Sequence, residues 1–172
     1  MSKNFYIADQ HLFHENIIRL SNRPYHSIEE MHKDMIEKWN RKVSDDDTVY
    51  ILGDVSLGHS EQVISIFKKL KGKKVLVLGN HDHKCLRNPK FKQLFEEITL
   101  YKEIVDDNYR VILFHYPIEE WNGYFRNSIH LYGHVHINDG NLKEIKNRYN
   151  VGADKLNMEP CTLKEIFEIY SK

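Results

Sequence analysis

Short apolar runs that end in polar residues are the feature of this sequence that most restricts its fold. Residues 5–8 form one such run, and later runs end in the same way. The polar residues that follow them are, in order, Asp9 with His11, Gly53 with Asp54, residues 79–82, His115, and residues 133–136. In open sheets built from parallel strands, ligands bind beyond the carboxyl ends of the strands. We therefore expect these polar residues to meet in one site, although they are distant in sequence.

Helical patterns separate the runs in the first half of the chain. Across residues 27–43 the apolar side chains recur at helical spacing, and Ser27 followed by Glu30 is a capping-box signature. Residues 48–52 are strand-like, residues 61–70 are amphipathic, and residues 74–78 are strand-like again. A strand, a helix and a strand in this order predict a right-handed parallel crossover.

The second half of the chain is richer in strands. Residues 98–105 and 110–114 flank the turn-forming residues 106–108 and predict a hairpin. Strands are expected at residues 129–132 and 148–151, and an amphipathic helix at residues 162–170. A chain of 172 residues without internal repeats or long linkers predicts one α/β domain that covers residues 1–172.

Composition excludes several classes of partner and location. The 25 basic and 25 acidic side chains cancel, so the general cationic field of a non-specific nucleic-acid or membrane binder is absent. No apolar run approaches the roughly 20 residues of a membrane span, and residues 1–5 resemble no secretory leader, so we expect a cytoplasmic protein. Cys85 and Cys161 stand far apart and predict neither a disulfide framework nor a thiolate zinc site.

The polar residues at the strand ends are a plausible set of metal ligands. They offer carboxylates, an amide oxygen and several imidazoles but no thiolate, and this mixture suits manganese, iron, zinc, cobalt or nickel. A set of this size exceeds the needs of one tetrahedral ion. Two ions about 3.5 to 4 Å apart that share a carboxylate would use all the donors, in the arrangement that serves in-line displacement at phosphorus.

Five short motifs together resemble the calcineurin-like metallophosphoesterase superfamily. They are DQH at residues 9–11, GD at 53–54, GNHD at 79–82, His115, and GHVH at 133–136. The segments HENII at residues 14–18 and YNVGAD at residues 149–154 are similar to small bacterial and phage phosphoesterases. The resemblance implies an α/β fold of two packed mixed β-sheets flanked by helices, in a four-layer αββα sandwich.

The resemblance also implies how the site works. One metal ion would be held by Asp9, His11 and His136, a second by Asn80, His115 and His134, and Asp54 would bridge them. A hydroxide held between two cations is activated for attack on phosphorus, because the cations lower the pKa of its parent water. His81 would protonate the leaving oxygen or stabilise charge, since a free imidazole has a pKa of about 6.5, and Asp82 would be its partner.

Three residues are expected to touch the substrate, and two of them have an alternative role. His14 either contacts the substrate or acts as a helix cap or a support for a metal ligand. Arg23 either holds a phosphate through its planar guanidinium or is a solvated loop residue before Pro24. Asn80 is expected to contact substrate as well as metal.

The predicted function is a dinuclear metal-dependent phosphoester hydrolase that prefers phosphodiesters or nucleotides. The residues after Asp54 read VSLG, and GNHD stands where the serine/threonine protein phosphatases have GNHE, so phosphoproteins are not the expected substrates. The expected partner is a small phosphorylated molecule, such as a nucleotide or a nucleic-acid end, and not a membrane. The alternatives are a phosphomonoesterase, a nuclease with the same chemistry, and a non-catalytic binding scaffold of the same fold.

Overall fold

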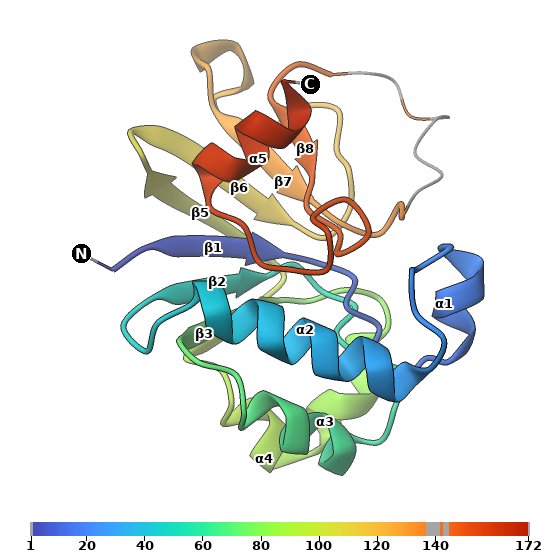
Figure 1. Cartoon of the computed structure of the whole chain (residues 1–172). Coiled ribbons are helices and arrows are strands. Elements are labelled where there is room, and N and C mark those ends of the chain that lie inside the picture. The colour runs from blue at the N-terminus through green and yellow to red at the C-terminus, as the bar shows by residue number, and fades with distance from the viewer. Residues whose placement is uncertain (1, 137–141, 143–144, 172) are drawn as a thin grey trace.

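The computed structural model describes residues 2–136, 142 and 145–171, and the strands in this part of the chain form two four-stranded sheets (Figure 1). The first sheet is parallel throughout and contains, in spatial order, β1 (Asn4–Ile7), β2 (Thr48–Ile51), β3 (Lys73–Val77) and β4 (Glu97–Thr99). The second contains, in spatial order, β5 (Tyr101–Asp106), β6 (Tyr109–Phe114), β7 (Ile129–Tyr132) and β8 (Arg148–Asn150). In the second sheet β5 pairs antiparallel with β6, because a two-residue turn joins them, and the other pairs are parallel.

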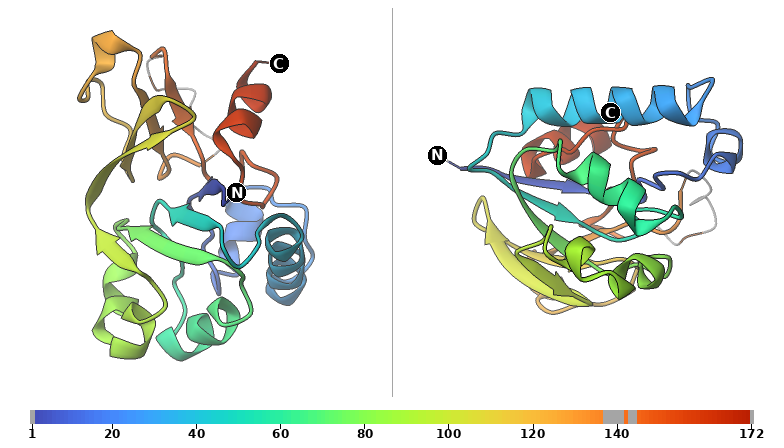
Figure 2. Two further views of the ribbon diagram at one scale, coloured as in Figure 1. Left: turned by 90° about the vertical axis from the view of Figure 1, so that its left-hand side faces the viewer. Right: turned by 90° about the horizontal axis from the view of Figure 1, so that it is seen from below.

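The predicted α/β class with two packed sheets flanked by helices is confirmed. Within the described residues, the mixed pairing expected of both sheets is found in the second sheet alone. Helix α2 (Ile28–Lys42) lies on one side of β1 and β2, and strands β5 and β6 lie on the other side (Figure 2, right).

Alternating side chains of the first sheet separate two apolar cores. Phe5 and Ile7 of β1 pack with the residues of α2 and α3 (Ser60–Phe67), whereas Tyr6 and Ala8 pack with those of the second sheet. Strand β2 continues the alternation, with Ile51 in the first core. Because both faces of the first sheet are buried, its strands read as nearly continuous apolar runs.

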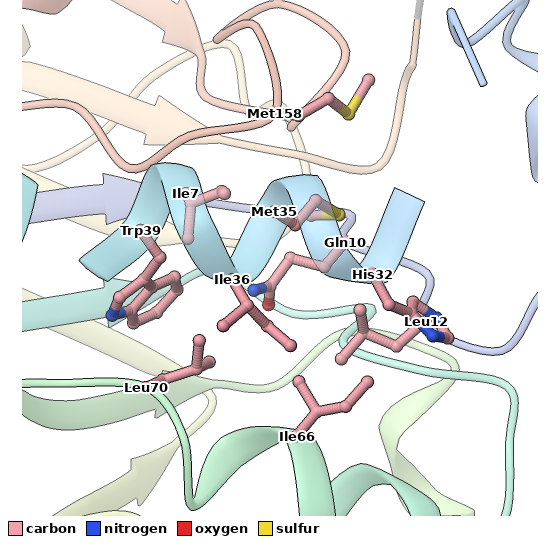
Figure 3. A pocket seen from close by; sticks show the side chains of 10 residues that line it. All are labelled: Ile7, Gln10, Leu12, His32, Met35, Ile36, Trp39, Ile66, Leu70 and Met158. Atoms are coloured by element: carbon pink, nitrogen blue, oxygen red, sulfur yellow. The ribbon is translucent and has the colours of Figure 1, made fainter. Parts of the chain in front are cut away.

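Helix α2 covers the first core. Ser27 caps the helix, since its hydroxyl accepts a hydrogen bond from Glu30 N at 3.1 Å. In a capping box, the side chain of Glu30 would accept from the backbone N of Ser27. Here Glu30 Oε2 accepts instead from the backbone N of the preceding residue, His26, at 2.7 Å. Met35 and Trp39 face Ile7 and Leu70 across the core (Figure 3). Burial of each such side chain contributes about 1.5 to 3 kcal/mol, which explains why this helix is the most clearly encoded element.

Helix α5 (Leu163–Tyr170) packs on the second sheet. The ring of Phe167 lies 5.5 Å from that of Tyr109 in β6 and 5.4 Å from that of Tyr149 in β8. These three rings pack against the core that the two sheets share, and Leu163 and Ile166 of α5 are buried in it. The opposite face of the second sheet is covered by the segment between β6 and β7, where Trp121 packs 5.2 Å from His130.

The structure corrects one predicted strand. The expected strand at residues 98–105 is divided between β4 in the first sheet and β5 in the second, with Leu100 between them. The chain crosses from one sheet to the other at this point, and an apolar pattern does not encode such a crossing. The predicted hairpin is confirmed, and its turn residues Asp107 and Asn108 have positive φ of 46° and 66°.

Four short helices were not predicted from the periodicity of apolar residues. They are α1 (Asn16–Leu20), the 3-10 helices η1 (Asp82–Arg87) and η2 (Tyr124–Arg126), and α4 (Pro89–Lys92). None of the described helices is long and apolar enough to cross a membrane. The cytoplasmic location stays a prediction.

Candidate metal centre

Polar segments that are distant in sequence meet at the carboxyl ends of the strands. The arrowheads of β1, β2, β6 and β7 point to the same side of the molecule (Figure 1). Backbone hydrogen bonds join the segments that follow these strands: Asp9 N to Gly53 O at 3.0 Å, His11 N to Asp54 O at 3.1 Å, and Gly133 N to His115 O at 2.9 Å. The structure therefore brings the predicted ligand segments side by side.

The first cluster of candidate ligands consists of Asp9, His11 and His136. One ligand atom from each side chain lies within 4.8 Å of the others. Asp9 and His11 are almost fully buried, and Asp9 Oδ1 and both ring nitrogens of His11 have no hydrogen-bond partner among the described residues. Buried donors and acceptors are normally paired, so the orphaned atoms of Asp9 and His11 fit a role as ligands of a cation.

The second cluster consists of Asp54, His115 and His134. One possible ligand atom from each of these side chains again lies within 4.8 Å of the others. His115 Nδ1 lies 2.7 Å from Leu52 O, and because a carbonyl can only accept, this nitrogen carries the proton. Its Nε2 is then left with a lone pair, 3.6 Å from Asp54 Oδ2 and 3.2 Å from Asn80 Oδ1. The structure thus places Asn80 beside the second cluster.

Asp54 lies between the two clusters. Its Oδ2 atom is 3.8 Å from His11 Nε2 in the first cluster and 3.6 Å from His115 Nε2 in the second. Its Oδ1 atom accepts a hydrogen bond from the backbone N of His81 at 2.9 Å. A single carboxylate is therefore within reach of both groups of imidazoles.

The electrostatics of the two clusters favour a bound cation. Burial raises the pKa of Asp9 well above its usual range, and repulsion from Asp54 adds to the increase. Burial also lowers the pKa of His11 to about 2, with a further contribution from His136. The pKa of His115 and the pKa of His134 are lowered by burial as well. Repelling carboxylates among neutral imidazoles form a donor set that fits divalent transition ions.

Several ligands have an unusual backbone conformation. Asp9, His11, Asp54 and His134 have positive φ between 50° and 71°. Such residues cost of order 1 to 3 kcal/mol each and persist only where the surroundings hold them. The surroundings of these residues are tightly packed, because the ends of the strands approach one another closely: a Cβ at Gly133 would stand 2.5 Å from Asp9 Oδ2. Glycine precedes His134 because a larger residue at position 133 would collide with Asp9.

Asp82 joins two of the ligand segments. Its side chain is buried, and its oxygens accept hydrogen bonds from the backbone N of Asp54 at 3.1 Å, of Val55 at 3.0 Å and of Gly79 at 2.8 Å. Asp82 was predicted to be the partner of His81, but these contacts direct its carboxylate to the backbone. It holds the turns that present Asp54 and Asn80.

Two further histidines lie at the open side of the clusters. The side chain of His81 is 44% exposed, and its Nε2 atom lies 3.9 Å from Asp54 Oδ2. The ring of His14 lies 5.7 Å from that of His11, and burial lowers its pKa. Glu15 is the N-cap residue of α1 and makes no side-chain cap, so the helix-cap role considered for His14 receives no support.

Arg23 is enclosed by the protein. Its guanidinium donates to Asp154 Oδ1 at 2.7 Å, to Asp154 Oδ2 at 3.4 Å, to Gln10 O and Asp9 O at 2.8 Å each, and to Met31 Sδ at 3.4 Å. Its side chain is 0% exposed, so the solvated-loop alternative is wrong. The predicted phosphate contact has no free guanidinium donor in this arrangement, because these bonds match the five N–H groups of arginine.

Two residues near the clusters received no role from the sequence. Asp154 Oδ2 lies 2.8 Å from His136 Nδ1, and although burial alone would raise the pKa of Asp154, His136 and Arg23 hold it below its usual value. The signal for Asp154 was its place in the YNVGAD segment. Tyr116 follows His115 directly; the residue is 36% exposed, and its ring lies 4.7 Å from that of His134.

Comparison with known proteins identifies relatives of uncharacterized function. No family model matches this chain. The chain is 32% identical over 178 aligned residues to MJ1445, an uncharacterized protein of Methanocaldococcus jannaschii, and the match covers 100% of this chain and 93% of that protein. The chain belongs to the same family as MJ1445.

Solved structures show that the fold is shared more widely. The crystal structure of AQ665, a protein of unknown function from Aquifex aeolicus, is similar with a TM-score of 0.78 and 26% identity, over 98% of this chain and 100% of that one. The structure of an archaeal phosphodiesterase is similar with a TM-score of 0.52 and 20% identity, over 87% of this chain and 81% of that one. At this identity the second similarity is evidence of fold alone.

Proposed function

We propose that this protein is a dinuclear metal-dependent phosphoester hydrolase of the calcineurin-like metallophosphoesterase type, with a preference for diesters. The observation that carries the proposal is the pair of ligand clusters that share Asp54, with orphaned ligand atoms on Asp9 and His11. The fold that the chain shares with an archaeal phosphodiesterase supports it.

The clusters divide the ligands between two ions. Asp9, His11 and His136 would hold the first, and Asn80, His115 and His134 the second, with Asp54 shared. When bound, two divalent ions of manganese, iron, zinc, nickel or cobalt would supply Lewis-acid stabilisation of the phosphoryl oxygens and activation of water.

The chain's own residues would orient the ester and move the proton. Asn80 turns its amide oxygen toward His115, which leaves its amide N–H groups to donate to a phosphoryl oxygen. His81 is the exposed imidazole beside Asp54 and would donate a proton to the leaving oxygen. Asp82 would keep Asp54 and Asn80 in place through the hydrogen bonds that it accepts from the backbone of Asp54 and Gly79.

Tyr116 supports a preference for esters with an aromatic group, such as nucleotides. Its ring is exposed beside His134, where a base could stack. Stacking of one base on an aromatic side chain contributes about 1 to 3 kcal/mol. We expect Tyr116→Ala to raise the KM for a nucleotide diester by about 5- to 100-fold and Tyr116→Phe to change it little. Equal effects of both variants would remove this preference from the proposal.

The central test is hydrolysis of bis-p-nitrophenyl phosphate by purified protein supplied with Mn²⁺, Ni²⁺ or Zn²⁺. We expect turnover by the wild type, and a rate no greater than that of metal in buffer for Asp54→Ala and Asn80→Ala. Asp46→Ala is the matched control, because Asp46 is an exposed acidic residue away from the clusters. Wild-type protein that cleaves neither diesters nor p-nitrophenyl phosphate with any of these metals refutes the proposal, and faster cleavage of the monoester favours a phosphomonoesterase.

The role of His81 can be separated from a general loss of activity. A p-nitrophenolate leaves readily without a proton, whereas an alkoxide does not. We expect His81→Ala to slow cleavage of a methyl or nucleoside ester by about 10²- to 10⁴-fold and cleavage of the p-nitrophenyl ester by much less. Equal loss on both substrates would remove His81 from the role of proton donor.

A further inference from the structure

The ring of His136 is oriented by a carboxylate from a distant part of the chain. His136 Nδ1 lies 2.8 Å from Asp154 Oδ2, and the hydroxyl of Ser21 lies farther from the same nitrogen, at 3.4 Å. An ionised carboxylate can only accept, so this contact puts the proton on Nδ1 and leaves the lone pair on Nε2. The ring is thereby fixed in the tautomer that can ligate through Nε2 beside Asp9 and His11.

Arg23 fixes that carboxylate and the ligand loop together. Its Nε donates to Asp154 Oδ1 at 2.7 Å, and its two terminal nitrogens also donate to the carbonyl oxygens of Gln10 and Asp9 at 2.8 Å each. The guanidinium is 0% exposed and the carboxyl group is 3% exposed, so the pair is shielded from solvent. One side chain therefore connects the partner of His136 with the backbone between Asp9 and His11.

In the second cluster, the acceptor that orients the histidine is weaker. His115 is also held through Nδ1, but its acceptor is the neutral carbonyl of Leu52, at 2.7 Å. A carboxylate partner makes an imidazole a stronger ligand than a neutral carbonyl does, and removal of such a partner typically weakens metal binding by 10- to 100-fold.

We propose that Asp154, held by Arg23, is the positioning residue for His136, and that it makes the site of Asp9, His11 and His136 the tighter of the two metal sites. This inference rests on the proposed function, because it requires that the clusters bind metal. It assigns a role to two segments, the Arg23–Pro24 loop and the YNVGAD segment, that the hydrolytic mechanism does not use.

The test is titration of metal-free protein with Mn²⁺, followed by calorimetry and by the electron paramagnetic resonance signal of free Mn²⁺. We expect two sites of different affinity in the wild type. In Asp154→Asn the tighter site should weaken by about 10- to 100-fold, while the other changes by less than about 3-fold. The matched control is Asp106→Asn, since Asp106 also accepts side-chain hydrogen bonds, from Tyr6 and Asn4, at the other end of the strands.

The outcomes separate the two proposals. A wild type that binds no Mn²⁺ refutes the proposed function and this inference together. Two bound ions whose affinities are unchanged in Asp154→Asn, or are weakened equally, refute the inference and leave the function standing. Should the variant fail to fold, long-range ¹H–¹⁵N spectra of the wild type with Zn²⁺ decide the matter: a proton on His136 Nδ1 is expected, and one on Nε2 contradicts the inference.

Discussion

Replacement of Asp82 by alanine should destabilise the protein strongly, because this carboxylate is the acceptor for three backbone groups. Its oxygens lie 3.1 Å from Asp54 N, 3.0 Å from Val55 N and 2.8 Å from Gly79 N, and its side chain is 1% exposed. Each buried N–H that loses its partner costs about 1 to 3 kcal/mol. Burial raises the pKa of Asp82, which means that the buried charge is itself unfavourable, and its removal offsets part of that loss. We therefore expect a loss of about 3 to 5 kcal/mol in the free energy of unfolding.

Urea denaturation of metal-free protein measures this loss without the contribution of bound ions. Asp82→Asn should fall between the wild type and Asp82→Ala. Its amide oxygen can still accept from Asp54 N and Gly79 N, which share one carboxylate oxygen in the structure, and only the bond from Val55 N is lost. Asp46→Ala, at an exposed position, should stay within about 0.5 kcal/mol of the wild type. A loss below about 1 kcal/mol in Asp82→Ala would refute the role assigned to Asp82.

Three further predictions concern pH, packing and metal. Burial lowers the pKa of His130 from 6.5 to about 4, so the unfolded chain binds this proton at a higher pH than the folded protein does. As the pH falls from 6.5 to 4, the free energy of unfolding should therefore decrease by up to about 3 kcal/mol. In urea titrations at several pH values, His130→Gln should make this decrease smaller, whereas the exposed control His26→Gln should not. Gly133→Ala would place a Cβ 2.5 Å from Asp9 Oδ2, so Mn²⁺ binding and hydrolysis should be lost with an unchanged circular dichroism spectrum, and a fully active variant contradicts the packing. Mn²⁺ at 100 times its dissociation constant should stabilise the wild type by about 2.7 kcal/mol in thermal unfolding, and an equal gain in Asp54→Ala would place the binding elsewhere.

The sequence encodes the strand ends clearly, and the structure shows why. Residues such as Asp9 and Asp54 follow short apolar strands whose ends lie at one edge, so parallel topology alone brings them together. The helix that covers the first core was also predicted, because α2 repeats its apolar residues at helical spacing along a single face.

The supports of the site were harder to predict. Arg23 and Asp154 are separated by 131 positions, and neither has a periodic or local signal that reveals their ion pair. The contacts of Asp82 are with backbone groups, which a side-chain motif does not reveal. The division of residues 98–105 between two sheets was missed because apolar alternation gives the faces of a strand and not the sheet to which it belongs.

The pair of metal sites can be located by anomalous diffraction from crystals grown with Mn²⁺. We expect two peaks for each chain, one among Asp9, His11 and His136 and one among Asn80, His115 and His134, with Asp54 between them. A single peak, or peaks outside these residues, would contradict this expectation.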